Sequence, residues 1–161
     1  MSHIKIKKID SHFESVVSVI RESYLTVAEE FKITKENGSS NPAFIELEHL
    51  HEMNKKGIEM YGAFVDSSCI GFVALENAEN GLYYLEKLAV LPSQRHHGYG
   101  LQLIDFVFNR VKRLGGKEIS IGIINENTIL KEWYLDYGFK EIEIKRFEHL
   151  PFTVCLLRKN V

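Results

Sequence analysis

The sequence predicts a single mixed α/β domain whose elements follow the order β-α-α-β-β-β-α-β-α-β-β. Three observations lead to this prediction: short apolar or alternating runs typical of strands, apolar residues at helical spacing, and turn-forming clusters between them. At 161 residues and 45% hydrophobic composition, the chain is long enough for one packed core and short for two domains. We therefore expect residues 1–161 to form one domain.

The first part of the chain is predicted to hold a strand and two helices. Residues 4–9 alternate apolar and basic side chains, which is typical of a half-exposed strand. A capping-box pattern at 11–14 precedes apolar residues at helical spacing as far as Tyr24. After a mixed segment, the Asn-Pro pair at 41–42 opens a second helix that we expect to run through to Gly57.

The rest of the chain is predicted to alternate between strands and helices, with hairpin turns inside its two groups of strands. Helices are recognised by apolar spacing and by a glycine at the end, and strands by short apolar runs. The predicted elements are strands at 59–66, 69–76 and 82–91, a helix at 101–116, a strand at 118–124, a helix at 127–138, and strands at 139–147 and 152–159.

Composition excludes several classes of partner. The net charge of −2 arises from 20 basic and 22 acidic residues that are interspersed, so the chain lacks the charge excess that holds nucleic acid or an anionic membrane surface. The N-terminus lacks the apolar core of a signal peptide, and no segment has the ~20 apolar residues of a membrane span. We expect a soluble cytoplasmic protein. His49 and His51 lie on different sides of a predicted helix, so we also expect no metal site.

The segment QRHHGYG, residues 94–100, joins a predicted strand to a predicted helix. A helix N-terminus presents unpaired backbone N–H groups that bind phosphate where the backbone can approach closely. Gly98 and Gly100 permit that approach, and Arg95 can add a charge-assisted hydrogen bond. The segment therefore predicts a diphosphate-binding loop, although a surface turn whose glycines supply positive φ is the alternative on these residues alone.

Two segments together resemble the GNAT superfamily of acyl-coenzyme A-dependent N-acyltransferases. They are LEKLAVLPSQRHHGYGLQLIDF at 85–106 and NENTILKEWYLDYGF at 125–139. The residues that match the pattern of the family are Val90, Pro92, Arg95, Gly98, Gly100, Asn127, Tyr134, Gly138 and Phe139. His96 departs from it, because many members have glycine there. The resemblance implies a GNAT-like three-layer fold around a central, mostly antiparallel and splayed sheet.

The same resemblance implies that acetyl-coenzyme A is the co-substrate and that no metal takes part. In the family, the end of the strand, the following loop and a second helix hold this molecule, and backbone groups of the strand meet the thioester. The matching residues are Leu88, Ala89, Val90, Arg95, His96, His97, Gly98, Tyr99, Gly100, Leu101, Asn127 and Tyr134. On sequence alone, Asn127 fits equally well as an ordinary helix N-cap.

Three residues are candidates for proton transfer during acetylation of a primary amine by direct attack in a ternary complex. An alkylamine with a pKa near ~10.4 is mostly protonated at pH 7, so a base must remove a proton. Glu86 is the first candidate for the base, and His149 in the last hairpin is the second. Tyr134 is the candidate acid for the leaving thiolate. The alternatives are a solvated glutamate, a bystander histidine and a packed aromatic ring.

The acceptor is the part of the reaction that the resemblance describes least. We expect the segment 24–41 and the last hairpin to line its pocket, and the candidate residues are Tyr24, Thr26, Phe31 and Tyr84. Glu29 and Glu30 in the same segment would suit a cationic amine if they face inward. A small-molecule amine, a peptide N-terminus and a lysine side chain all remain open as acceptors. A homodimer is compatible with the family, in which dimers are common. Two other functions remain: a non-catalytic acyl-coenzyme A-binding module and an unrelated nucleotide-binding domain.

Overall fold

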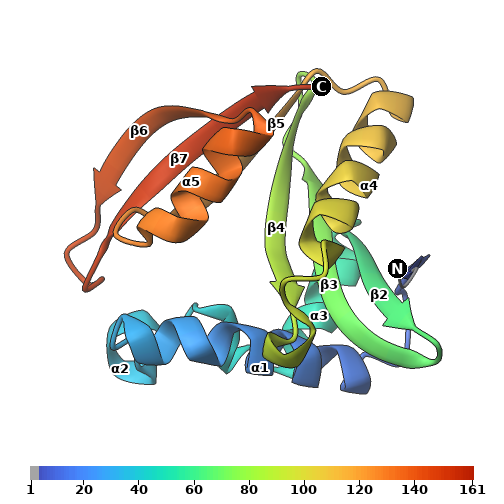
Figure 1. Cartoon of the computed structure of the whole chain (residues 1–161), viewed down its shortest axis with the longest axis horizontal. Coiled ribbons are helices and arrows are strands. Elements are labelled where there is room, and N and C mark those ends of the chain that lie inside the picture. The colour runs from blue at the N-terminus through green and yellow to red at the C-terminus, as the bar shows by residue number, and fades with distance from the viewer. Residues whose placement is uncertain (1–3) are drawn as a thin grey trace.

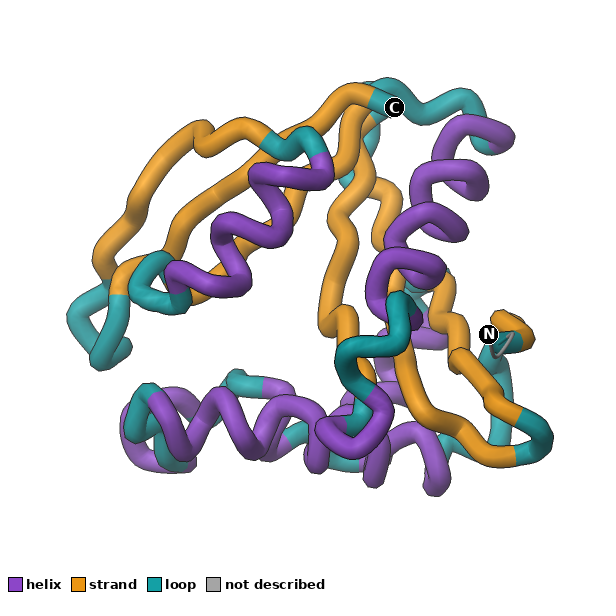
Figure 2. Tube along the Cα trace, viewed as in Figure 1, coloured by secondary structure: helices purple, strands orange, loops and turns teal. Residues whose placement is uncertain are grey.

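Residues 4–161 are described by a computed structural model and form a seven-stranded mixed sheet with helices on both faces (Figure 1; Figure 2). In chain order the elements are β1 (Lys5–Lys8), α1 (Glu14–Glu30), α2 (Lys35–Gly38), the 3₁₀ helix η1 (Pro42–Phe44), α3 (Leu47–Lys55), β2 (Glu59–Val65), β3 (Ser68–Asn77), β4 (Leu82–Val90), the 3₁₀ helix η2 (Pro92–Gln94), α4 (Tyr99–Arg113), β5 (Glu118–Ile124), α5 (Thr128–Tyr137), β6 (Lys140–Arg146) and β7 (Thr153–Asn160). The predicted mixed α/β class is confirmed.

The sheet has the strand order β1-β2-β3-β4-β5-β7-β6, and it opens in the middle. Neighbouring strands are antiparallel except for β4 and β5, which run parallel. These two strands pair only at Leu82–Tyr84 with Glu118–Ser120 and then diverge, as Figure 1 shows. The splayed sheet expected from the resemblance is therefore present, and the divergence separates the ends of β4 and β5.

A β-bulge interrupts β4 just before its end. Ala89 pairs with Phe72 and Glu86 pairs with Ala74, so β4 contains one more residue than β3 between these pairs. Lys87 lies in this interval and has a φ of 54°, a left-handed conformation that is uncommon for a residue with a side chain. The bulge therefore bends β4 where it leaves β5 and changes which face its side chains meet.

Two hydrophobic cores pack on opposite faces of the sheet. Leu103, Val107 and Val111 of α4 are fully buried against one face. The N-terminal half of α1 is buried against the other face, for example through Ile20, together with residues of α3. Since each helix has one apolar stripe, the three layers follow from the amphipathic pattern of the sequence.

The N-terminal helices differ from the prediction in two ways. Helix α1 begins after Phe13, which caps it without a side-chain hydrogen bond, and His12 before it has a positive φ of 54°. The predicted capping box of Ser11 and Glu14 was therefore wrong. The second helix is not continuous: Ile45 and Glu46 are extended between η1 and α3. Ile45 is buried in the core below α1, and its carbonyl accepts a hydrogen bond from Arg21, which stabilises the extended backbone.

Candidate active site

One cavity of about 960 Å³ lies where β4 and β5 diverge. Its walls come from the C-terminal half of α1, the segment between α2 and η1, the ends of β4 and β5, the loop before α4, the first turn of α4, and α5. Leu150, Phe152 and Val154 close it from the β6–β7 side. Segments from most of the chain therefore converge on this site.

The loop before α4 presents a row of unpaired backbone N–H groups. Within residues 4–161, no N–H group from His96 to Leu101 donates a hydrogen bond to another protein atom. These groups lie at the N-terminus of the fifteen-residue helix α4, where the helix dipole is positive. Such a row is suited to the diphosphate of a nucleotide-like ligand.

The two glycines of this loop have different physical roles. Gly98 is the N-cap of α4 and has a φ of 79°, a conformation that other residues adopt with strain. Gly100 lies inside the first turn of α4, where a Cβ atom would lie 3.7 Å from the Trp133 ring and 4.0 Å from Val90. Gly98 therefore shapes the loop, whereas Gly100 leaves space open at the cavity.

Arg95 lines the cavity, but its guanidinium contacts α1 and β4. Its Nε donates to the carbonyl of Val90 at 3.2 Å. Its terminal nitrogens donate to the carbonyl of Ser23 at 2.7 Å and to the hydroxyl of Thr26 at 3.2 Å. We expected this side chain at the diphosphate, whereas in the structure it ties the loop to α1.

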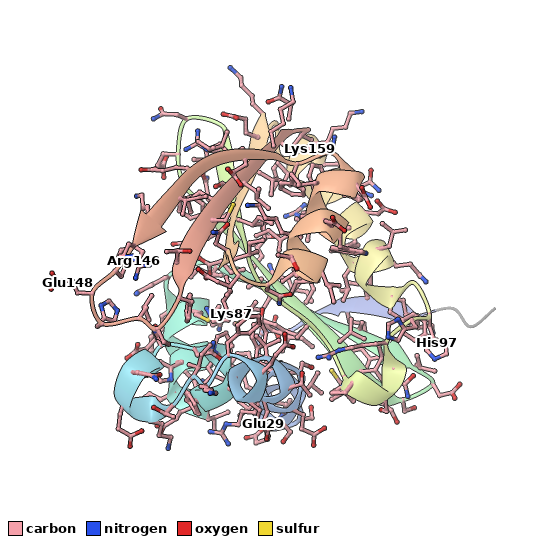
Figure 3. All side chains as sticks on the ribbon, turned by 60° about the vertical axis from the view of Figure 1, so that its left-hand side comes forward. Glu29, Lys87, His97, Arg146, Glu148 and Lys159 are labelled. Carbon is pink, nitrogen blue, oxygen red and sulfur yellow. The ribbon has the colours of Figure 1, made fainter. Side chains whose placement is uncertain are left out.

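The other predicted loop residues divide into inward and outward side chains. His96 lines the cavity, and Tyr99 is buried at its base. His97 is exposed and lies at the outer edge of the molecule in Figure 3, with its ring 5.6 Å from that of Tyr99. Leu101 is 45% exposed at the rim of the cavity. The loop therefore contacts the cavity mainly through its backbone.

Tyr134 projects from α5 into the cavity and is only 4% exposed. Its ring packs edge-on against Trp133 and Phe139, with centroids 5.0 Å and 5.5 Å away. In residues 4–161 its hydroxyl has no hydrogen-bond partner, and burial, with a smaller effect of Tyr24, raises the pKa of Tyr134 above its usual value. The hydroxyl therefore stays protonated and is available as a donor.

Tyr24 and Asn127 both form hydrogen bonds with backbone groups in the wall of the cavity. The hydroxyl of Tyr24 donates to the carbonyl of Leu88 at 3.0 Å, and burial raises the pKa of Tyr24. Asn127 accepts a hydrogen bond from the N–H of Leu130 at 3.3 Å, so it caps α5 while it also lines the cavity. Tyr24 thus holds β4 at its bulge.

Glu86 lies half-buried in the cavity wall on β4. Burial raises the pKa of Glu86 to about 7, and the nearby carboxyl group of Glu76 contributes in the same direction. Lys87 and Lys56 act electrostatically in the opposite direction. At neutral pH this carboxyl group therefore exchanges protons readily, which is the property that a general base requires.

The remaining predicted residues lie at different distances from the cavity. Thr26 lines it, whereas Phe31 packs in a small apolar cluster beside α1. Tyr84 is 41% exposed and is absent from the cavity wall. His149 is exposed on the β6–β7 loop next to Leu150, which does line the cavity. The structure thus brings Tyr24, Thr26, Glu86 and Tyr134 together and leaves the other three outside.

Several wall residues were missed by sequence reasoning. Val27 and Glu30 are not among them: they lie in the segment 24–41 that we expected to line the acceptor pocket, and both line the cavity on α1, which continues to Glu30. Lys87 also lines the cavity, but a regular strand would have pointed it to the other face from Glu86. No pattern in the neighbouring sequence predicts the bulge.

The part of the chain that the structure describes, residues 4–161, contains no cluster of three or more His, Cys, Asp or Glu side chains suited to a metal ion. Among its helices, none combines the length and the apolar character needed to cross a membrane.

Comparison with known proteins assigns the family. The model of the acetyltransferase (GNAT) family matches residues 24–139. GCN5-related N-acetyltransferase 6, chloroplastic, of Arabidopsis thaliana is 25% identical over 83 residues, which are 52% of this chain and only 29% of that protein.

Solved structures share the fold across nearly the whole chain. PaiA N-acetyltransferase from Thermoplasma acidophilum, in complex with coenzyme A, has a TM-score of 0.76 and 23% identity, with 99% of each chain covered. A GNAT family acetyltransferase from Elizabethkingia anophelis with acetyl-CoA bound has a TM-score of 0.71 and 18% identity, with 98% of each chain covered. The resemblance seen in the sequence is confirmed, and the chain belongs to the GNAT acetyltransferase family.

Proposed function

We propose that this protein transfers an acetyl group from acetyl-coenzyme A to a primary amine by direct attack in a ternary complex. The proposal rests on the groups that line one cavity. This cavity combines loop N–H groups and a Tyr134 hydroxyl that have no hydrogen-bond partner within residues 4–161 with the Glu86 carboxyl group, whose pKa is about 7. Together these groups provide binding for a diphosphate, an acid and a base.

The residues of the cavity fit acetyl-coenzyme A as the donor substrate. Its diphosphate would bind the N–H groups of His96 to Leu101, and Gly100 leaves room for this close approach. Its pantetheine arm would lie between the diverging strands, next to the backbone of Leu88 to Val90. Coenzyme A or acetyl-CoA in solved structures of the same fold supports this assignment.

The acid and base have properties that match the two proton transfers of amide formation. The amine nitrogen forms a bond to the thioester carbonyl carbon, its proton passes to the Glu86 carboxylate, and the carbon–sulfur bond then breaks. The sulfur leaves as a thiolate, which accepts a hydrogen bond and then a proton from the Tyr134 hydroxyl. Because the pKa of Tyr134 is raised, its main contribution is the hydrogen bond to the developing charge.

A panel of amines tests the proposal, with free thiol as the readout. The protein is incubated with acetyl-coenzyme A and one amine at a time, and thiol release is compared with release without amine. We expect acceleration by at least one amine and its loss in Tyr134→Phe. Thermal stabilisation by acetyl-coenzyme A without thiol release for any amine would instead support a non-catalytic binding module.

A further inference from the structure

We infer that the acceptor amine carries a carboxylate, and that Lys87 binds this carboxylate. The inference rests on the proposed function and names its substrate class. Lys87 directly follows Glu86 in β4, and both residues line the cavity. A cation and a proton acceptor on adjacent residues suit a small molecule that has both an amine and an anionic group.

The β-bulge explains how two consecutive strand residues reach one cavity. In a regular strand, Lys87 would share a face with Leu85, which is buried in the core below α4. Ala89 lies four residues after Leu85 but belongs to the core below α1, so the strand changes face between them. The bulge and the left-handed φ of Lys87 thus turn its side chain away from the apolar core. Non-glycine residues in this conformation often mark functional sites.

Lys87 has no protein partner that would account for its charge. Within residues 4–161, its ammonium group takes part in no hydrogen bond and lies within ion-pair distance of no carboxylate. The other cationic side chain of the cavity wall, Arg95, already donates three hydrogen bonds to α1 and β4. Lys87 is half-buried, so an anionic ligand would replace the solvation that it has lost.

The position of Lys87 places it on the acceptor side. Figure 3 shows Lys87 in the opening between α1–α2 and the β6–β7 hairpin, in which Arg146 ends β6 and Glu148 lies in the loop. His97 of the diphosphate-binding loop lies on the opposite side of the same view. The charge is therefore remote from the part of the cavity that would hold the donor diphosphate, and near the part left for the acceptor.

The remaining wall on the acceptor side contains an apolar patch beside the polar side chains of Glu30, Ser40 and Asn41. Val27, Ile33, Leu150 and Phe152 form this patch. Consecutive Cα atoms are about 3.8 Å apart, so Glu86 and Lys87 can contact two groups of one small molecule. An amine, a carboxylate and an apolar substituent on one small molecule describe an amino acid with an apolar side chain, and this is the acceptor class that we assign.

Matched pairs of amines test the role of Lys87. L-Leucine and 3-methylbutylamine differ only in the carboxylate, as do L-phenylalanine and 2-phenylethylamine. We expect the wild-type KM to be at least about tenfold lower for the carboxylate-bearing member, the usual strength of one charge-assisted hydrogen bond. Lys87→Met should remove this discrimination while the KM for acetyl-coenzyme A stays within about twofold. Lys87→Asn serves as a second variant, because asparagine tolerates the left-handed backbone.

Lys56→Met is the matched control. Lys56 also lowers the pKa of Glu86, but it is exposed and absent from the cavity wall. Replacing either lysine should therefore raise the pKa of Glu86 and move the pH profile of turnover to higher pH. Only the Lys87 variants should lose the preference for the carboxylate-bearing amines. Comparing the KM ratio of each pair between the wild type and a variant cancels the different basicities of the paired amines.

Thermal shift with coenzyme A present gives a second readout that needs no turnover. The amino acids should stabilise the wild-type protein more than their paired amines, and the Lys87 variants should lose the difference. Equal KM values and equal stabilisation for both members of each pair would overturn the inference while thiol release still supported the proposed function. Intact discrimination in Lys87→Met, with a raised KM for acetyl-coenzyme A, would also overturn it. Absence of thiol release with every amine would instead contradict the proposed function.

Discussion

The two sides of the cavity, which we propose bind the acetyl donor and the acceptor amine, are formed by different chemical groups. The donor side consists mainly of backbone: unpaired N–H groups at the start of α4, made accessible by two glycines. The proposed acceptor side consists of side chains, among them Tyr24, Glu86 and Lys87, together with an apolar patch. Binding by backbone N–H groups requires that no side chain covers them, so it depends on glycine. Binding by side chains depends on the identity of each residue. The two sides should therefore respond differently to substitution.

The largest expected effect is on the donor side, at Gly100. In Gly100→Val, the added methyl groups would occupy the space above the N–H groups and prevent close approach of the diphosphate. The wild-type protein should gain about 2.7 kcal/mol when acetyl-coenzyme A is present at a hundred times its Kd, and the variant should gain almost nothing. Thermal unfolding with and without acetyl-coenzyme A measures the difference.

Gly100→Ala is the control, because its single Cβ would make only ordinary contacts with Trp133 and Val90. The apo forms of both variants should unfold close to the wild-type temperature. If acetyl-coenzyme A stabilises Gly100→Val as strongly as the wild type, the donor side is not a backbone-binding site.

Tyr134 stands between the two sides and should give the second largest effect. Tyr134→Phe keeps the ring contacts with Trp133 and Phe139 and removes only the hydroxyl. We expect kcat to fall roughly 10²-fold, the lower end for positioned acid catalysis, while the Kd for coenzyme A is nearly unchanged. Steady-state kinetics and a binding titration measure the two quantities. Wild-type turnover in this variant would leave Tyr134 as a packed ring.

Arg95 lies in the loop of the proposed donor side, but its side chain contacts α1, so its substitution should affect stability more than coenzyme A binding. Arg95→Met removes three hydrogen bonds, to Ser23, Thr26 and Val90. We expect a loss of about 2 kcal/mol in the free energy of unfolding, since a charged donor is replaced at a partly exposed site. Urea unfolding measures this loss. A stability near the wild-type value, together with salt-sensitive weakening of coenzyme A binding, would make Arg95 a diphosphate ligand instead.

The same contrast explains how much could be predicted from the sequence. The donor loop was predicted because glycines and a helix start leave a local pattern, and the apolar spacing of α4 predicted its buried face. Both features depend on residues that are close together in the chain. The order of strands and helices followed from the same kind of local periodicity, and the structure confirms it except in the segment before α3.

The failures arise where distant residues decide the local structure. Ile45 is extended because it packs into the core and accepts a hydrogen bond from Arg21, 24 positions away. Lys87 faces the cavity because of a bulge against β3. Arg95 contacts α1, about 70 positions earlier in the chain. None of these interactions leaves a pattern in a short window of sequence, so most of the acceptor side could be described only from the structure.

The smallest expected effect concerns Glu86 and the dependence of stability on pH. The pKa of Glu86 in the folded protein is about 7, above its ordinary value of 4.5, so folding favours the protonated form. This contribution to stability is fully present below pH 4.5 and is lost as the pH rises through 7. Glu86→Gln remains neutral, so it should match the wild type at pH 4.5 and be more stable at pH 8. Because the side chain is half-buried and solvent screens its charge, we expect a difference of about 1 kcal/mol by urea unfolding.

The activity of the same variant connects this effect to catalysis. In the wild type, kcat/KM should rise as the pH passes through about 7, because the carboxylate must be deprotonated to accept the proton of the amine. Glu86→Gln should lose this limb and recover part of its turnover as the pH approaches the pKa of the amine, where the neutral amine needs no base. His149→Ala is the control, since His149 lies outside the cavity, and its profile should keep the limb near pH 7. If the limb disappears in His149→Ala and persists in Glu86→Gln, the base is His149 on the β6–β7 loop.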